Sequence, residues 1–314
     1  MSKVNFAVNL NGFTNTGDLA GMIEFIETAE ALGYDSVKFM DHVVGVVADK
    51  HPELGFTPYT HKSHFHECFV FMGYMAARTK RIRFITGVLG LPQRQTALVA
   101  KQLAEIDVLT GGRVTLGAGI GYNATEFEAM GANFKERAKV FEEQVHVMRM
   151  LWTQESVEFQ GKYHTLNHVN INPAPIQKPI PIWIGSGRTH SPIPPEAVVN
   201  RVGRLADGWV PLFRNDEATG RPKNETVDCI ERMRGYAKEA GRNPDDVIIE
   251  LGVFTHGKTT QRVVDEVKAL CDLGTTHIHA RVSGETTEEM VNGSPTSRQI
   301  EDIKRFTDVM DHFR

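Results

Sequence analysis

Short runs of β-branched and aromatic residues alternate with longer stretches of helical periodicity along the whole chain. This alternation predicts βα units and a parallel sheet. The runs expected to be strands are Val4–Leu10, Ser36–Met40, Ile82–Val88, Val114–Ile120, Pro181–Ile184, Gly208–Leu212, Val247–Val253 and His277–Val282. Eight such units predict an α/β fold, a (β/α)8 or TIM barrel, which we expect to form a single domain over residues 1–314.

Helix signals support this pattern at several places. Asp18 is expected to cap the N-terminus of a helix over Leu19–Leu32, and Gly33 stands at the position after its C-terminus. Further helices are expected over Thr96–Thr110 and Arg137–Trp152.

Three longer segments interrupt the regular alternation. The first is the long segment between the fourth and fifth strands, in which the helix over Arg137–Trp152 is followed by residues 157–179, predicted to form a hairpin and a proline-rich return. The other two insertions are Val43–Phe65 and Thr189–Pro195. All three follow strands, so in a barrel they are expected at the C-terminal face, where active sites of this fold lie.

A doubly wound open sheet is the alternative architecture, because it also alternates strands and helices. Its dinucleotide fingerprint is missing from this chain. Gly117, Gly119 and Gly121 form GxGxG, which is followed by Tyr122 rather than completing GxGxxG.

The composition narrows the class of protein. Hydrophobic residues make up 41% of the chain and charged residues 24%, which is typical of a soluble globular protein. The net charge of −4 and the lack of lysine or arginine runs argue against a nucleic-acid partner. The three cysteines are far apart, and neither a signal peptide nor a run long enough to span a membrane is apparent. We therefore expect a cytoplasmic protein without a membrane partner.

Glycine-rich strand ends suggest where a ligand binds, because glycine lets backbone approach a flat, phosphorylated molecule closely. Barrel chemistry comes from the ends of several strands. The candidates read in chain order are Asn11, Asp41, His42, Gly87, Val88, Gly121, Tyr122, Gly185, Ser186, Gly187, Arg188, Phe213, Arg214, His256 and Arg281.

Among these candidates, the neighbours Asp41 and His42 give the most specific indication of catalytic chemistry. An imidazole titrates near neutrality and can exchange a proton with a reacting group. The alternative is a histidine with a structural role. Tyr122 could donate a hydrogen bond to a reacting oxygen or pack as an aromatic lid, and Glu126 suits the first turn of a helix, where a carboxylate is favoured.

The segment Gly185-Ser186-Gly187-Arg188 follows a strand and offers backbone N–H groups, a hydroxyl and a guanidinium. These groups could hold a phosphate, and the alternative is a tight turn before a helix.

Two further groups of residues bear on metal binding and on Schiff-base chemistry. His61, His64 and His66 lack the spacing of a catalytic zinc motif, so no metal is expected, and their insertion is expected to line a substrate pocket. A barrel lyase or isomerase would need a Schiff-base lysine, for which Lys38 is the candidate.

Several motifs resemble the bacterial-luciferase-like superfamily of flavin-dependent monooxygenases and coenzyme F420-dependent oxidoreductases. The similarity extends over nearly the full length. It rests on LGYDSVKFMDHV, on TKRIRFITGVLGLPQRQTALVAKQLAEIDVLTGGRVTLGAGIGYNATEFEAMG, on FKERAKVFEEQVHVMRMLW, on NPAPIQKPIPIWIGSG and on RLADGWVPL.

This resemblance implies a site for the ring of F420 or FMN at the barrel mouth. It places a bulge or a non-proline cis peptide at Gly87-Val88 to support the ring, and backbone at Gly185, Ser186 and Gly187 against the cofactor phosphate. It implies that Asp41 and His42 contact the ring and the reacting centre. Gly121 and Arg188 join this expected cofactor site. The sugar-phosphate dehydrogenases of the group have a glutamate where this chain has Tyr122, so the resemblance does not extend to their substrate.

The resemblance leaves two enzyme interpretations and one of another class. The first is F420-dependent hydride transfer to or from a small organic substrate, with His42 as acid or base and Tyr122 as hydrogen-bond donor. The second is a monooxygenase that uses reduced FMN and O2 and depends on a partner flavin reductase. The third is a non-catalytic flavin-binding protein. Relatives are commonly homodimers or larger homo-oligomers, and the same is expected here.

Overall fold

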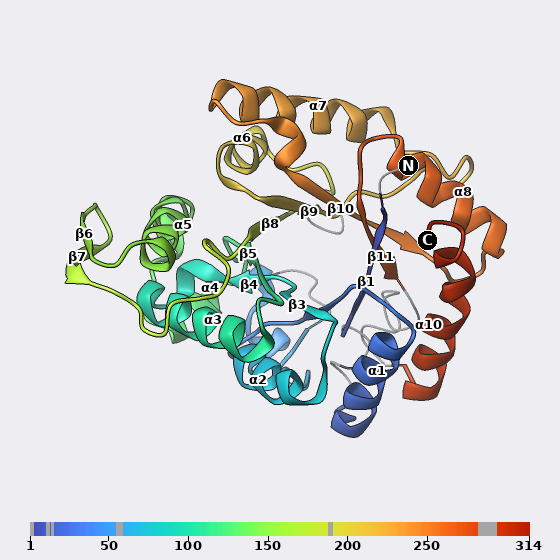
Figure 1. The fold of residues 1–314 in the computed structure, drawn as a ribbon, viewed down its shortest axis with the longest axis horizontal. Coiled ribbons are helices and arrows are strands. Elements are labelled where there is room, and N and C mark those ends of the chain that lie inside the picture. Colours follow the sequence, from blue (N-terminus) through green and yellow to red (C-terminus); the bar gives the residue numbers. More distant parts are fainter. Residues whose placement is uncertain (1–2, 11–12, 14–15, 55–58, 188–190, 282–293) are drawn as a thin grey trace. The chain divides into compact units, whose positions relative to one another are not determined.

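Parallel strands alternate with helices along the chain in the computed structural model (Figure 1). It describes residues 3–10, 13, 16–54, 59–187, 191–281 and 294–314. Each expected run coincides with a strand to within two residues at either end. The strands are β1 (Asn5–Asn9), β2 (Ser36–Phe39), β3 (Arg83–Thr86), β5 (Val114–Gly119), β8 (Ile182–Ser186), β9 (Gly208–Pro211), β10 (Ile248–Phe254) and β11 (His277–Arg281). The fold is the predicted (β/α)8 barrel.

The helices follow the strands as the periodicity predicts. They are α1 (Leu19–Ala31), α2 (Cys68–Arg78), α3 (Thr96–Thr110), α4 (Ala124–Ala129), α5 (Arg137–Thr153), α6 (Glu196–Leu205), α7 (Asn224–Glu239), α8 (Thr260–Cys271) and α10 (Thr296–Met310). The Asp18 side chain accepts a hydrogen bond from the Gly21 N–H at 2.9 Å, which confirms its role as the cap of α1. Gly33, just after this helix, has φ = +84° and gives the chain its left-handed turn.

The chain divides into two compact units, of which unit 1 comprises Met1–Lys38 and Trp183–Arg314. Its strands pair in parallel in the order β2, β1, β11, β10, β9, β8. Phe6 of β1 packs edge-on against Phe306 of α10, with 5.8 Å between ring centroids. The Tyr34 hydroxyl donates to the Ile303 carbonyl at 3.0 Å, so this C-terminal helix is held by both apolar and polar contacts.

Unit 2 comprises Phe39–Ile182 and contains the strands β3 and β5, which pair in parallel. A two-residue strand, β4 (Leu89–Gly90), pairs with the end of β5. The predicted hairpin is present as the antiparallel strands β6 (Val157–Gln160) and β7 (Thr165–Val169). Trp152 of α5 is buried and donates its indole N–H to the Ala100 carbonyl at 3.0 Å, which anchors α5 on α3.

Among the helices of the described residues, none combines the length and the apolar character that crossing a membrane requires.

Candidate functional site

The ends of β2, β3 and β5 lie side by side in unit 2 and are joined by hydrogen bonds. The Gly87 N–H donates to the Phe39 carbonyl at 2.7 Å, which ties the end of β3 to the end of β2. The Thr86 hydroxyl donates to the Gly117 carbonyl at 2.7 Å, which ties β3 to β5. Residues from three distant parts of the sequence therefore form one surface at the carboxyl ends of the strands.

The peptide bond between Gly87 and Val88 is cis, which confirms the position expected for a bulge or cis peptide after the third strand. Val88 lies against the end of β5, because a Cβ atom added to Gly119 would stand 3.1 Å from its Cγ2 atom. The predicted contact of Gly87 and Val88 with a cofactor ring stays a prediction.

The glycines at the end of β5 are required first by the packing of unit 2. A Cβ atom at Gly117 would lie 2.0 Å from the Thr86 carbonyl oxygen, so only glycine lets β3 and β5 approach here. Gly121 has φ = +72°, and a Cβ atom there would also meet the Phe127 ring at 2.7 Å. The glycine-rich pattern, which we interpreted as room for a ligand, thus serves close strand packing at Gly117 and a left-handed turn at Gly121.

Asp41 is buried just after β2, and protein groups hold both of its carboxylate oxygens. Oδ1 accepts from the Arg94 guanidinium at 2.6 Å, and Oδ2 accepts from the Gly90 N–H at 3.3 Å. Burial raises the pKa of the Asp41 carboxyl above its ordinary value, although the Arg94 charge and the Gly90 hydrogen bond oppose this shift. The carboxylate therefore fixes the chain after β2 onto the segment after β3, and its predicted role toward a cofactor stays a prediction.

His42 is half-buried and surrounded by aromatic rings. Its ring centroid lies 4.8 Å from that of Phe65, 5.4 Å from that of Tyr59 and 6.0 Å from that of Tyr122. The structure thus brings together the two residues predicted to be catalytic, His42 and Tyr122. Tyr122 is 45% exposed, and its ring meets that of His42 edge-on.

Glu126 is the partner of His42 that the sequence did not reveal. Its Oε2 atom lies 3.2 Å from the His42 Nδ1 atom, and its Oε1 atom accepts from the Val43 N–H at 2.6 Å. Burial alone would raise the pKa of Glu126, but the hydrogen bond and charge of His42 and the amides of Val43 and Val44 outweigh burial and hold this pKa below its ordinary value. The carboxylate is therefore kept charged beside the imidazole.

The position of Glu126 in the first turn of α4 agrees with the sequence-based interpretation. Asn123 caps this helix, with its side-chain oxygen accepting from the N–H groups of Thr125 and Glu126 at 3.1 and 3.3 Å. The interpretation missed the side-chain contact with His42, which is 84 positions away. No local pattern could have signalled this contact, because it depends on how β2 and β5 are placed in the sheet.

The insertion after β2 folds over His42 and lines a narrow cleft with it. The cleft holds about 10 Å³, room for about one water molecule. Its lining residues are His42, Val44, Gly45, Val46, Leu54, Tyr59, Thr60, Phe65, Tyr122 and Asn123. The insertion thus contributes apolar and aromatic side chains to the surroundings of His42. His61, His64 and His66 belong to the same insertion, and over the residues that the structure describes no group of three metal-ligating side chains is found.

The segment expected to bind phosphate belongs to unit 1, where β8 ends. The Ser186 hydroxyl accepts from the Trp209 indole N–H at 2.7 Å. Gly187 has φ = +89°, and a Cβ atom there would lie 2.7 Å from the Pro192 carbonyl oxygen, so this turn requires glycine. Gly185 precedes them within the strand, while Arg188 lies outside the described residues. Phosphate binding by this segment stays a prediction.

The other strand-end candidates of unit 1 have contacts of their own. The guanidinium groups of Arg281 and Arg214 lie 4.8 and 5.5 Å from the centre of the Phe254 ring. Phe213 packs edge-on against Trp209. His256 is exposed, and Asn11 lies outside the described residues.

Lys38 does not have the surroundings of a Schiff-base lysine at a barrel mouth. It is buried in unit 1, with 6% of its side chain exposed, and its ammonium group pairs with the carboxylate of Glu250 on β10. A nucleophilic amine must be free to attack a substrate carbonyl, whereas this amine is enclosed in unit 1 beside a carboxylate. The lyase or isomerase interpretation thus gains no support from this residue.

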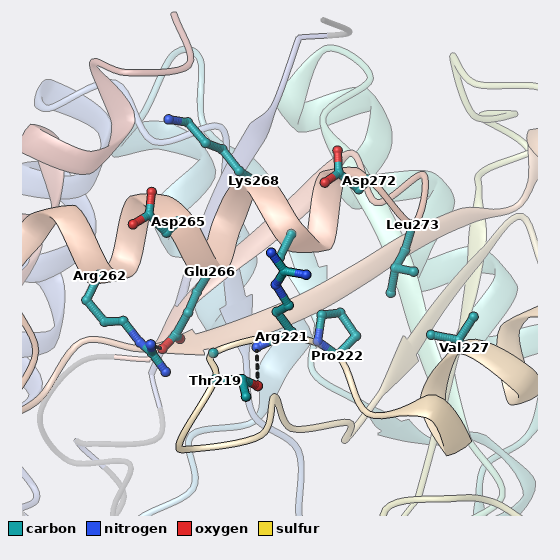
Figure 2. A pocket seen from close by; sticks show the side chains of 12 residues that line it. Thr219, Arg221, Pro222, Val227, Arg262, Asp265, Glu266, Lys268, Asp272 and Leu273 are labelled. Carbon is teal, nitrogen blue, oxygen red and sulfur yellow. Dashed lines mark hydrogen bonds and ion pairs between the residues drawn. The ribbon is translucent and has the colours of Figure 1, made fainter.

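A larger pocket of about 590 Å³ lies between α8 and the segment 219–222 of unit 1 (Figure 2). Two of its charged side chains are bound to protein groups: the Arg262 Nε atom donates to Glu266 at 3.0 Å, and a terminal nitrogen of Arg262 donates to the Glu217 carbonyl at 3.0 Å. The strand-end candidates are not among the residues that line it, so we place the candidate site around His42 despite the smaller cleft there.

Known proteins resemble this chain in sequence and in fold. An uncharacterised protein of Mycobacterium tuberculosis is 33% identical over 268 residues, 83% of this chain and 84% of that protein. An F420-dependent glucose-6-phosphate dehydrogenase of Mycolicibacterium gilvum is 31% identical over 232 residues, 72% of this chain and 61% of that enzyme. The solved structure of an F420-dependent secondary alcohol dehydrogenase, in complex with an F420-acetone adduct, has a TM-score of 0.74 at 18% identity and covers 99% of both chains, which shows the shared fold.

The family model described as luciferase-like monooxygenase matches residues 4–310, nearly the whole chain. This match shows that the chain belongs to the luciferase-like monooxygenase family.

Proposed function

We propose that this protein is an F420-dependent oxidoreductase that transfers a hydride between the coenzyme and a small organic substrate. The observation that carries the proposal is the position of His42, which is half-buried, enclosed by aromatic rings and next to the glycine-bearing ends of β3 and β5. The relatives named as F420-dependent enzymes, which include one 31% identical over 72% of this chain, favour this coenzyme.

We place the ring of the coenzyme against the strand ends of unit 2, where Gly87 carries no side chain. In the proposal, the backbone at Gly87, Val88 and Gly121 contacts the ring of the coenzyme. For unit 1 by itself, we propose that the backbone N–H groups of Gly185, Ser186 and Gly187 bind a phosphate. When bound, the coenzyme supplies the hydride chemistry, and the protein supplies orientation and exclusion of water.

Hydride transfer between the coenzyme and an alcohol or carbonyl is accompanied by transfer of a proton. In the proposal, His42 exchanges this proton with the substrate. When an alcohol is oxidised to a carbonyl, its C–H hydrogen leaves as hydride and its O–H proton must go to a base. His42 takes up this proton in that direction and donates it to the carbonyl oxygen in the reverse direction. The Tyr122 hydroxyl donates a hydrogen bond to the same oxygen, and the rings of Tyr59 and Phe65 keep bulk water away from the imidazole.

A reduced-FMN monooxygenase that depends on a partner flavin reductase is the second candidate. The description of the matching family favours it, and the aromatic enclosure of His42 would also suit chemistry from which water must be excluded. A flavin-binding protein without catalytic activity is the third candidate and predicts tight binding without turnover.

Parallel fluorescence titrations with F420 and FMN separate the two enzyme candidates. Preference for F420, followed by coenzyme reduction on addition of small alcohols, supports the proposal, whereas preference for FMN favours the monooxygenase. His42→Ala is expected to bind the coenzyme within about tenfold of the wild type and to lose about 10²–10⁴ in kcat, because general acid–base groups contribute that much to rates. His312→Ala, at an exposed position, is the control. An unchanged kcat in His42→Ala would refute the role of His42.

A further inference from the structure

The contact between His42 and Glu126 determines which imidazole nitrogen carries the proton. A carboxylate is only an acceptor, so the His42 Nδ1 atom, 3.2 Å from the Glu126 Oε2 atom, must carry a hydrogen to bond with it. In the neutral imidazole this leaves Nε2 without a proton and with its lone pair available. His42 also lines the cleft, so Nε2 is the nitrogen that remains for a substrate.

Glu126 is itself held in one orientation. Its Oε1 atom accepts from the Val43 N–H at 2.6 Å, and that amide directly follows His42 in the chain. Its own backbone N–H is bound by the Asn123 side chain at 3.3 Å, and only 5% of its side chain is exposed. The carboxylate therefore binds both the imidazole of His42 and the backbone N–H of Val43. These two contacts fix the orientation of the imidazole as well as its tautomer.

We propose that Glu126 is a positioning residue for the reaction, which keeps the proton of neutral His42 on Nδ1 and presents Nε2 as the base. The proposal rests on the proposed function for its kinetic part, whereas the tautomer of His42 can be measured without any turnover. Among the residues that the structure describes near His42, the Asp41 carboxylate is bound by Arg94 and Gly90, and Tyr59, Phe65 and Tyr122 contact the imidazole as rings.

Substitution of Glu126 by glutamine tests this directly, because an amide has one acceptor and one donor. The Val43 N–H needs the acceptor oxygen, so in the variant Glu126→Gln the N–H₂ group of the new side chain would face His42 Nδ1. Nδ1 must then act as the acceptor, and the proton moves to Nε2. We expect the variant to fold and to hold His42 in the opposite tautomer.

The first measurement is a long-range ¹H–¹⁵N spectrum of protein labelled at histidine, recorded where His42 is neutral and assigned with His42→Asn. The wild type should show a protonated Nδ1, and Glu126→Gln should show a protonated Nε2. Glu126→Asp keeps the negative charge and should keep the wild-type tautomer. Glu128→Gln, an exposed position in the same helix, removes the same charge and should change nothing. A protonated Nδ1 in Glu126→Gln would overturn the proposal.

The second measurement is kinetic, with F420 and the best alcohol or carbonyl substrate found for the wild type. Glu126→Gln should lower kcat by about 10²-fold or more, because the wrong nitrogen then faces the substrate, while the coenzyme Kd stays within about twofold. Glu126→Asp should recover at least about tenfold of this loss. An inverted tautomer with unchanged kcat would overturn the catalytic part. A wild type that does not bind F420 would refute the proposed function, and the spectra would still decide the role of Glu126.

Discussion

Replacement of Gly117 by alanine tests whether the strand ends around His42 depend on the close approach of β3 and β5. The new Cβ atom would stand 2.0 Å from the Thr86 carbonyl oxygen, where ordinary contacts begin at 3.4 Å, and both groups belong to buried strands. The strands must therefore separate by more than ~1 Å, a form of overpacking that costs about 1–3 kcal/mol. The hydrogen bond from the Thr86 hydroxyl to the Gly117 carbonyl weakens as well, which adds about 1 kcal/mol.

The free energy of unfolding should therefore fall by about 2–4 kcal/mol, which lowers Tm by roughly 3–6 °C in a protein of this size. Urea unfolding followed by circular dichroism and a thermal scan measure both quantities. Gly235→Ala in α7 is the matched control, because nothing lies within 4 Å of a Cβ atom there and alanine favours a helix by about 0.5–1 kcal/mol. A Gly117→Ala variant as stable as the wild type would show that β3 and β5 give way without cost, and the packing argument would be wrong.

Two further predictions concern buried charges. Lys38→Met should lower the free energy of unfolding, measured by urea titration, by about 3–5 kcal/mol, because it leaves the Glu250 carboxylate buried without its ammonium partner. The double variant Lys38→Met/Glu250→Leu should recover most of this loss. A double variant no more stable than the single one would contradict this explanation. The Glu126 pKa is lower in the folded than in the unfolded protein, so its contribution to stability is fully present above the unfolded pKa and is lost as pH falls through the folded one. Urea titrations from about pH 7 to about pH 3 should show a smaller acid loss in Glu126→Gln than in the wild type, and equal pH dependence would refute the assigned shift.

The sequence by itself determined the order of strands and helices. The alternation of short apolar runs with helical periodicity placed all the barrel strands to within a few residues, because strand and helix periods are local properties of the chain. Helix ends were equally local: Asp18 and Gly33 act through backbone groups only a few positions away. The family motifs also placed a bulge or a cis peptide at Gly87-Val88, where the structure has a cis peptide.

Only the tertiary structure decided what the residues at the strand ends do. Asp41 proved to be bound by Arg94, Gly117 proved to be required by Thr86, and Glu126 proved to be the partner of His42. Each contact joins residues 31 to 84 positions apart, and no pattern within a single segment encodes it. Sequence periodicity fixes which residues reach the end of a strand, whereas the pairing and stagger of parallel strands fix which of those ends meet. That is why the chain could be assigned a histidine for proton transfer, while the carboxylate that orients it appeared only when β2 and β5 were placed in the folded protein.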